Sequence, residues 1–169
     1  MDVVLYETNQ ALSFSGEGIL TSGPIKLLDG AKLTNKTLPG VVSKEMPDLL
    51  TGCEWPNTND HMDYPKNALR IQSARAIHDA STIYLVKPTT NRAELEVLLF
   101  NIRMLRKARV PIAVVSLARN ENERSSEKDL NGYAALIGLS DEEISRGRAM
   151  LEKLTTTRFE HAYQLEQPR

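Results

Sequence analysis

The chain has 169 residues, of which 41% are hydrophobic and 25% are charged, and its formal net charge is −1. These values suit one globular domain with a packed core, so we expect residues 1–169 to form a single α/β domain. The charge near zero argues against a protein that covers nucleic acid or a membrane surface by bulk electrostatic attraction. A single cysteine, Cys53, excludes an intramolecular disulfide bond.

The N-terminus and the hydropathy of the chain indicate a cytoplasmic protein. The segment Met1–Glu7 has an acidic residue, Asp2, where a signal peptide has basic ones, and its apolar run is short. No stretch approaches the roughly 18 apolar residues of a membrane span. One unpaired cysteine also suits a reducing compartment. We therefore expect a cytoplasmic location and no contact with a membrane.

The first third of the chain predicts one strand followed by a turn-rich insertion at about residues 10–64. Val3–Tyr6 is a short apolar run that we place inside the sheet. Within the insertion, Ile25–Leu28 and Ala31–Thr34 flank Asp29-Gly30. Asp-Gly suits a two-residue turn because both positions need positive φ, so these segments predict a β-hairpin.

The rest of the insertion predicts little regular structure. Ser43–Leu50 predicts one or two helical turns, and Gly52–Tyr64 is polar and predicts a long loop. Its acids and histidine, Asp60, His61 and Asp63, have metal-ligand side chains but no helix or strand to fix their spacing. We therefore predict neither a metal ion nor a cofactor.

The stretch from Ser81 to Asn120 predicts a strand, a helix and a second strand. Thr82–Val86 and Pro111–Leu117 are apolar runs, and helix-spaced apolar residues lie between them: Leu95, Leu98, Leu99, Ile102 and Leu105. Two apolar strands joined by a helix are typical of a parallel βαβ unit that is buried on both faces. We therefore predict a Rossmann-like or flavodoxin-like three-layer α/β domain with a mostly parallel sheet and a small β-hairpin insertion.

Residues 130–166 predict a helical hairpin followed by an edge strand. Ser140–Glu143 has the capping-box pattern that begins a helix. Thr155–Thr157 disfavours continuation of that helix, because β-branched side chains are restricted in helices. Phe159–Leu165 then alternates with period two, which favours a final strand, with a continued helix as the alternative. An exposed edge strand pairs readily with another chain, so this strand predicts a homo-oligomer.

Polar residues follow each predicted strand of the parallel sheet, at the edge where ligands bind in open α/β sheets. They are Tyr6 and Glu7 after the first strand, Lys87, Thr89, Thr90, Asn91 and Glu94 after the second, and Ser116, Arg119 and Asn120 after the third. Glu94 lies three residues after the expected helix cap, Asn91, so it has two interpretations. It is either the second member of a capping box or a nucleophile or general base.

A family resemblance covers residues 70–117. The motif Ala-Ile-His-Asp-Ala-Ser at 76–81, a strand, and then Pro-Thr-Thr-Asn-Arg-Ala-Glu-Leu-Glu at 88–96 resemble the core of nucleoside 2-deoxyribosyltransferase-like proteins and of TIR domains. In both groups a glutamate near the start of the helix acts on an N-glycosidic bond, and the matching residue here is Glu94. The resemblance implies a nucleoside or nucleotide ligand, bound by residues after the strands.

A non-enzymatic interaction or regulatory module is the alternative function. Residues 130–153 resemble a helix-turn-helix, which reads DNA with its second helix. That helix begins with the acids Asp141, Glu142 and Glu143, whose negative charges repel the phosphates of DNA. We therefore expect a helical hairpin packed on the sheet, with DNA binding as a minor alternative.

Overall fold

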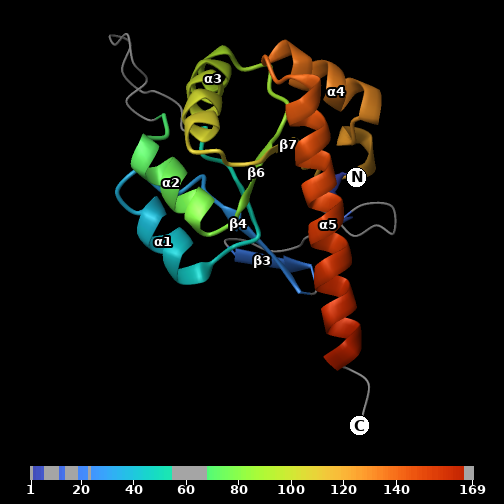
Figure 1. Cartoon of the computed structure of the whole chain (residues 1–169). Coiled ribbons are helices and arrows are strands. Elements are labelled where there is room, and N and C mark those ends of the chain that lie inside the picture. Colours follow the sequence, from blue (N-terminus) through green and yellow to red (C-terminus); the bar gives the residue numbers. More distant parts are fainter. Residues whose placement is uncertain (1, 6–11, 14–18, 23, 55–67, 166–169) are drawn as a thin grey trace.

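The computed structural model describes residues 2–5, 12–13, 19–22, 24–54 and 68–165 (Figure 1). Within these ranges the strands are β1 (Val3–Val4), β2 (Leu12–Ser13), β3 (Ile19–Ser22), β4 (Ile25–Asp29), β5 (Leu49–Thr51), β6 (Ile83–Val86) and β7 (Ile112–Val114). The helices are α1 (Leu38–Glu45), α2 (Ile71–Asp79), α3 (Arg92–Lys107), α4 (Glu127–Leu136) and α5 (Asp141–Leu165), with a short 3-10 helix, η1 (Glu121–Glu123).

The main sheet has the order β3-β4-β5-β6-β7, and only β3 runs antiparallel to its neighbour. The register places Leu50 opposite Tyr84, and Tyr84 opposite Ile112. β1 pairs with β2 and also lies beside the chain that follows β7, where the N–H of Leu117 donates to the carbonyl of Val3 at 2.9 Å. The mostly parallel sheet predicted from the sequence is confirmed.

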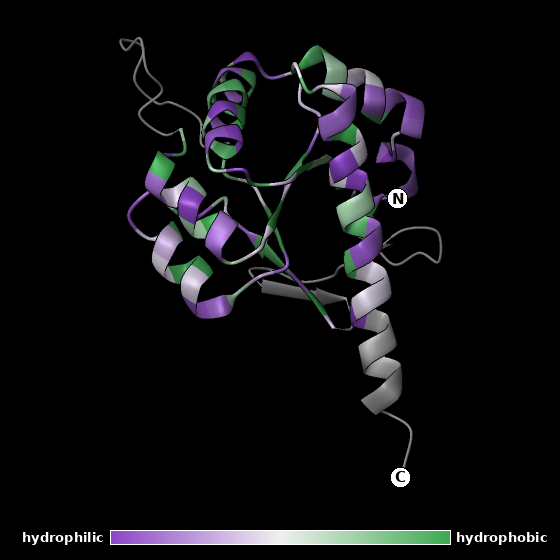
Figure 2. Cartoon of the chain, in the orientation of Figure 1, coloured by the Kyte–Doolittle hydropathy of each residue, from purple (hydrophilic) through white to green (hydrophobic). Residues whose placement is uncertain are grey.

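Helices cover both faces of this sheet, which gives three layers (Figure 1). Because β4 to β7 follow one another without a reversal of order, the connecting helices α1, α2 and α3 all lie on one face. α5 covers the other face along β6 and β7, and α4 packs beside it. The central strands β5, β6 and β7 are mostly apolar because both faces of the sheet are covered, and in Figure 2 the helices around them carry both hydrophilic and hydrophobic residues.

The βαβ unit is present as the sequence predicted it. β6, α3 and β7 occupy the three predicted segments, and Asn91 caps α3 by accepting the N–H of Ala93 at 3.0 Å. The predicted capping box at Ser140 is also present. The hydroxyl of Ser140 accepts the N–H of Glu143 at 3.2 Å, and the Glu143 carboxylate accepts the N–H of Ser140 at 2.9 Å.

The predicted β-hairpin between residues 25–28 and 31–34 is wrong, because residues 25–28 pair with the strand before them instead of with the segment after them. The hairpin in the structure pairs β3 with β4, so Ser22 faces Ile25. Residues 31–34 form turns, because the Asp29 carboxylate accepts the N–H of Ala31 at 2.9 Å and directs the chain away from β4. The helix predicted at residues 43–50 is also wrong in its bounds, since α1 ends at Glu45 and β5 begins at Leu49.

The predicted C-terminal edge strand is wrong, and the alternative, a continued helix, is correct. α5 runs to Leu165 through the three threonines that were expected to stop it. The hydroxyls of Thr155 and Thr156 donate to the carbonyls of Leu151 and Glu152, at 2.8 and 3.0 Å, so the helix itself accommodates them. The oligomer predicted through an edge strand therefore loses its structural basis.

Two contacts fix α5 on the sheet. Gly147 lies so close to β7 that a Cβ atom at this position would overlap the carbonyl oxygen of Ile112. Further along the helix, Arg158 forms an ion pair with Asp48, whose side chain is only 7% exposed. None of the helices within the described ranges is long and apolar enough to cross a membrane.

Candidate functional site

Two glutamates lie at the carboxyl ends of the neighbouring strands β5 and β6. Glu54 follows β5 by three residues, and its carboxyl oxygen accepts the hydroxyl of Tyr84, from β6, at 2.7 Å. Glu94, in the first turn of α3, accepts the hydroxyl of Thr89 at 2.6 Å. Glu94 raises the pKa of Glu54 by charge repulsion, so the two groups act on each other electrostatically. We call Glu54 and Glu94 the carboxyl pair.

The environment of Glu54 keeps its proton bound up to neutral pH. Its pKa is raised from 4.5 to about 7, mainly because burial disfavours the charged form. Repulsion from Glu94 and Asp29 adds to this increase, while hydrogen bonds from Tyr84 and from the Glu54 backbone oppose it. A carboxyl group with a pKa of about 7 is half protonated at neutral pH, which suits a general acid or base.

The tyrosine and cysteine beside Glu54 stay neutral. Burial raises the pKa of Tyr84 and the pKa of Cys53 well above their ordinary values, and the charge of Glu54 raises both further. The Tyr84 hydroxyl is therefore a neutral donor. The Cys53 thiol keeps its proton and is not a nucleophile.

Glu94 is not the second half of a capping box. The N–H of Asn91, which a capping-box glutamate would accept, donates instead to the hydroxyl of Thr89 at 3.1 Å. Thr89 thus links the helix cap to the Glu94 carboxylate. Its own N–H donates to the hydroxyl of Tyr133, from α4, at 3.2 Å, so β6, α3 and α4 together position Glu94.

A buried asparagine of α3 holds the chain next to Glu54. Asn101 is fully buried, and its amide nitrogen donates to the carbonyl of Cys53 at 2.9 Å. Its amide oxygen accepts the N–H of Leu69 at 2.7 Å. Asn101 follows Glu94 by two helical turns, so both lie on the same side of α3. That side of the helix therefore carries Glu94 itself and the asparagine that holds the backbone next to Glu54.

The structure brings only some of the predicted site residues together. Thr89, Asn91 and Glu94 form one connected group. Lys87 and Arg119 lie near a different acid, Glu123, whose pKa is lowered first by the backbone N–H of Arg119 and also by the charges of Lys87 and Arg119.

The remaining predicted residues stand apart from this group. Thr90 is exposed, and Ser116 is buried with its hydroxyl donating to the Asp2 carboxylate at 2.6 Å. Tyr6 and Glu7 lie outside the described residues, as do Asp60, His61 and Asp63. Among the described residues no three His, Cys, Asp or Glu side chains gather as a metal site.

Sequence reasoning missed Glu54, Tyr84 and Asn101. Glu54 was missed because Leu49 and Leu50, which belong to strand β5, were predicted as the end of a helix over residues 43–50, and Glu54 was predicted to lie in a long loop. With that strand recognised, the rule that ligands bind after parallel strands would have selected Glu54. Tyr84 and Asn101 also had a signal, since each is a polar residue within an apolar run.

Glu54→Gln is expected to change how stability depends on pH. The pKa of Glu54 is higher in the folded protein, about 7, than its ordinary value of 4.5, so the folded state holds a proton that the unfolded chain releases. This contribution is complete below pH 4.5 and is lost as pH rises through about 7, and it amounts to roughly 3 kcal/mol. The substituted glutamine would keep the Tyr84 hydrogen bond without a titrating proton, so the variant should gain stability relative to wild type over this range.

The measurement is urea unfolding of wild type, Glu54→Gln and Glu96→Gln at intervals between pH 4.5 and pH 8. Glu96 is an exposed glutamate of the same helix as Glu94, paired with Arg92 at 3.0 Å, and serves as the control. Parallel stability curves for wild type and Glu54→Gln would show that Glu54 titrates like an ordinary glutamate.

Comparison with protein-family models, with curated protein sequences and with solved structures finds no match to this chain.

Proposed function

We propose that the protein binds a nucleoside or nucleotide at the carboxyl ends of β5 and β6 and hydrolyses or transfers its N-glycosidic bond. The observation that carries this proposal is the carboxyl pair: two glutamates on neighbouring strand ends whose surroundings differ. Pairs of carboxyl groups in unequal environments are the usual machinery for breaking glycosidic bonds, because one acts as acid while the other acts as nucleophile or base.

The two glutamates take different roles in the proposed reaction. Glu54 holds a proton up to about pH 7 and gives it to the departing nucleobase, so the bond between the base nitrogen and the anomeric carbon breaks with its electrons on nitrogen. Glu94 either attacks the anomeric carbon or removes a proton from the incoming water or alcohol. In the first case Glu54, now deprotonated, activates the water or alcohol that releases the sugar.

Groups around the carboxyl pair supply contacts for the ligand. Thr90 and Asn91 stand at the N-terminus of α3, where backbone N–H groups and the helix dipole favour an anionic group. Lys87 and Arg119 follow β6 and β7, are both exposed and lie near Glu123, so in this proposal they reach a phosphate of a ligand from outside the carboxyl pair. The resemblance of residues 70–117 to the nucleoside 2-deoxyribosyltransferase-like proteins points to the same ligand class and the same glutamate.

The experiment is a thermal-shift and mass-spectrometric screen of nucleosides, nucleotides and NAD against wild type, Glu94→Gln and Glu54→Gln. A ligand that binds the folded state raises the melting temperature by mass action. Turnover should occur in wild type and should fall at least about a hundredfold in Glu94→Gln, since the variant lacks the reacting carboxylate. Glu96→Gln, on the same helix and exposed, should keep wild-type turnover.

The pH dependence separates the two roles. Wild-type turnover should decline as pH rises through about 7, because Glu54 then loses the proton it donates. Glu54→Gln should lose this decline together with most of the activity. If none of these compounds raises the melting temperature or is consumed, the proposal is wrong. If Glu94→Gln retains full turnover, Glu94 only supports the loop before α3.

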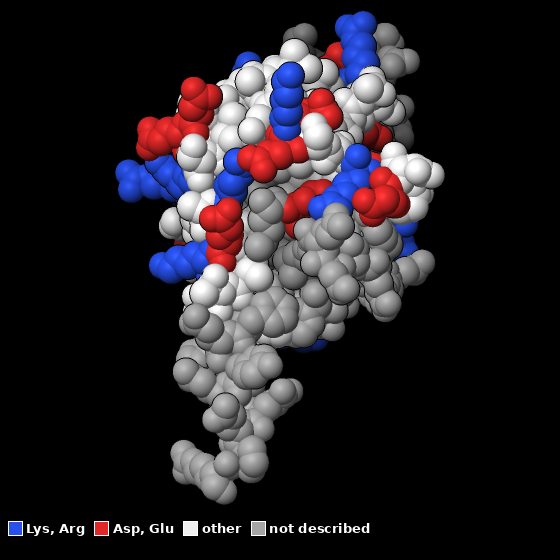
Figure 3. Space-filling model, turned by 90° about the vertical axis from the view of Figure 1, so that its right-hand side faces the viewer, with Lys and Arg blue, Asp and Glu red and all other residues white. Residues whose placement is uncertain are grey.

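Nucleic-acid binding through residues 130–153 is not part of this proposal. α5, which would be the recognition helix, packs on the sheet through Gly147 and the buried Leu151. The α4–α5 side of the molecule carries acidic and basic side chains intermixed, without a basic stripe, in Figure 3. A duplex needs a positive surface, so this side of the molecule does not favour it.

A further inference from the structure

A cavity that does not include the carboxyl pair lies between α4, α5 and β7. Its volume is about 250 Å³. Its apolar lining comes from both helices, their connection and the strand: Leu130, Ala134, Leu139, Ile144, Leu151, Ile112, Ala113 and Val114. Its polar lining is formed by Asp2, Arg124, Ser125, Glu127, Asn131 and Arg148. A cavity with an apolar wall and a few converging polar groups is the usual form of a small-molecule site.

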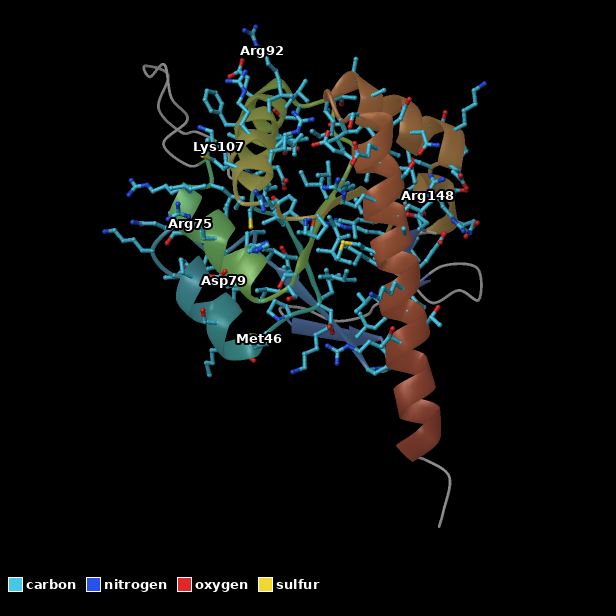
Figure 4. The ribbon with its side chains drawn as sticks, viewed as in Figure 1. Met46, Arg75, Asp79, Arg92, Lys107 and Arg148 are labelled. Atoms are coloured by element: carbon cyan, nitrogen blue, oxygen red, sulfur yellow. The ribbon has the colours of Figure 1, made fainter. Side chains whose placement is uncertain are left out.

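Arg148 is the main cation on the polar side. It projects from α5 toward α4 (Figure 4), where its guanidinium donates to the carboxylate of Glu127 at 2.6 Å and to the amide oxygen of Asn131 at 2.8 Å. The side chain of Arg148 is 33% exposed, but that of Glu127 is 66% exposed. An ion pair with so exposed a partner contributes little to stability, so a ligand carboxylate displaces Glu127 from Arg148 at small cost.

The other acid that lines the cavity, Asp2, already binds Arg124 and Ser116. Its side chain is 10% exposed and lies 3.7 Å from the guanidinium of Arg124. Its carboxylate also accepts the N–H of Ser116 at 2.7 Å and the Ser116 hydroxyl at 2.6 Å. Arg124 also pairs with Glu121 at 3.6 Å. Once Glu127 turns outward, Arg148 is therefore the guanidinium whose charge a ligand carboxylate would balance.

The main-chain N–H and carbonyl groups of residues 112 and 114, on the edge of β7, face away from β6. The carbonyl of Pro111 and the N–H of Val115 bind β6, so the main chain of residues 112 and 114 points to the other side of the strand. Gly147 of α5 covers the carbonyl of Ile112, and Val114 is one of the residues that line the cavity.

We propose that this cavity binds a small monocarboxylate with a compact apolar body, its carboxylate on Arg148 and its apolar part against Leu130, Ala134 and Leu139. A bidentate contact of a carboxylate with an arginine fits the planar guanidinium. The size also fits. An apolar cavity of about 150 Å³ accepts benzene, so about 250 Å³ suits an acid of roughly ten non-hydrogen atoms. Phenylacetate has this size and shape and is the probe.

The test is an amide NMR titration with phenylacetate and with phenylacetamide, its neutral isostere. Phenylacetate should bind saturably and shift the amide signals of α4, α5 and β7, and phenylacetamide should bind at least about tenfold more weakly because it cannot exchange for Glu127. This comparison uses only the wild-type protein, so it does not depend on the folding of a variant.

Two arginine variants then test the contact itself. Arg148→Met should weaken phenylacetate binding at least about tenfold. Arg146→Met is the matched control, because Arg146 is also on α5 and pairs with an exposed glutamate, Glu142, at 2.7 Å, but does not line this cavity. It should leave binding within about twofold of wild type.

Four results would overturn the proposal. Two concern binding itself: no saturable binding of phenylacetate, or equal binding of phenylacetate and phenylacetamide. The other two are equal effects of the two arginine variants, and shifts that gather at the carboxyl pair rather than at α4 and α5. None of these results bears on turnover at Glu94, so the two sites are tested separately.

Discussion

Gly147→Ala is expected to destabilise the folded state by about 3 kcal/mol or more. The added Cβ would overlap the carbonyl oxygen of Ile112 and would lie 2.9 Å from the Ile112 carbonyl carbon and 3.2 Å from the Cα of Ala113. All three are backbone atoms of β7, which no change of rotamer can move aside. Either α5 lifts from the sheet or β7 shifts, and each disturbs the buried Leu151.

Two other helical glycines provide matched controls. Gly40 in α1 and Gly132 in α4 have no atom within 4 Å of an added Cβ. Alanine at either position should stabilise the protein by about 0.5–1 kcal/mol, because it lowers the conformational entropy of the unfolded chain. Urea unfolding of the three variants should therefore give opposite signs. A stabilising effect of Gly147→Ala would mean that α5 does not lie against β7 as described.

The contrast between these glycines also shows what the sequence could not predict. In the sequence, Gly147 is a glycine within a predicted helix, as Gly132 is. Only the approach of α5 to β7 distinguishes it, and that approach depends on residues far apart in the chain. The same holds for Asp2, which the N-terminal segment places in reach of Ser116, 114 positions away.

The sequence predicted best where local pattern and burial agree. β6, α3 and β7 were found because their apolar residues follow strand and helix periods, and because Asn91 and Ser140 have capping side chains. It failed where two local signals competed. Phe159–Leu165 alternates like a strand, yet it continues a helix of 25 residues, because Thr155 and Thr156 satisfy their hydroxyls within the helix.

The candidate site was predicted in part for a related reason. Glu94 was identified because a strand and a capped helix before it are clear in the sequence. Glu54 follows β5, which has only three residues and is preceded by the helix α1, so no period marks it as a strand. Its raised pKa depends on burial beside Tyr84, which is a property of the tertiary structure alone.

Asn101→Leu is expected to destabilise the folded state by about 2–5 kcal/mol. Leucine has nearly the shape of asparagine, so the substitution removes hydrogen bonds without leaving a large cavity. The carbonyl of Cys53 and the N–H of Leu69 would then lose their partner at a fully buried side chain, and each unsatisfied group costs about 1–3 kcal/mol. Urea unfolding at fixed pH measures the loss.

Asn35→Leu is the control for burial. Asn35 makes the same kind of link, since its amide donates to the carbonyl of Ala68 at 2.8 Å and accepts the N–H of Arg70 at 2.8 Å. Asn35 also accepts the hydroxyl of the buried Ser73 at 2.9 Å. Because Asn35 itself is only partly buried, water replaces part of the lost bonds, and the expected loss is smaller, about 1–2 kcal/mol. Equal losses for the two variants would contradict the assignment of Asn101 as a buried link.

Asn101→Leu should also lower the pKa of Glu54. Cys53 directly precedes Glu54, so without Asn101 the backbone before Glu54 is no longer fixed and its carboxyl group gains access to water. The pKa of Glu54 should then fall from about 7 toward 4.5, since burial is the main cause of its increase. Carbon-13 NMR of the glutamate carboxyl groups measures this directly. An unchanged pKa in Asn101→Leu, beside a loss of stability, would limit Asn101 to a structural role.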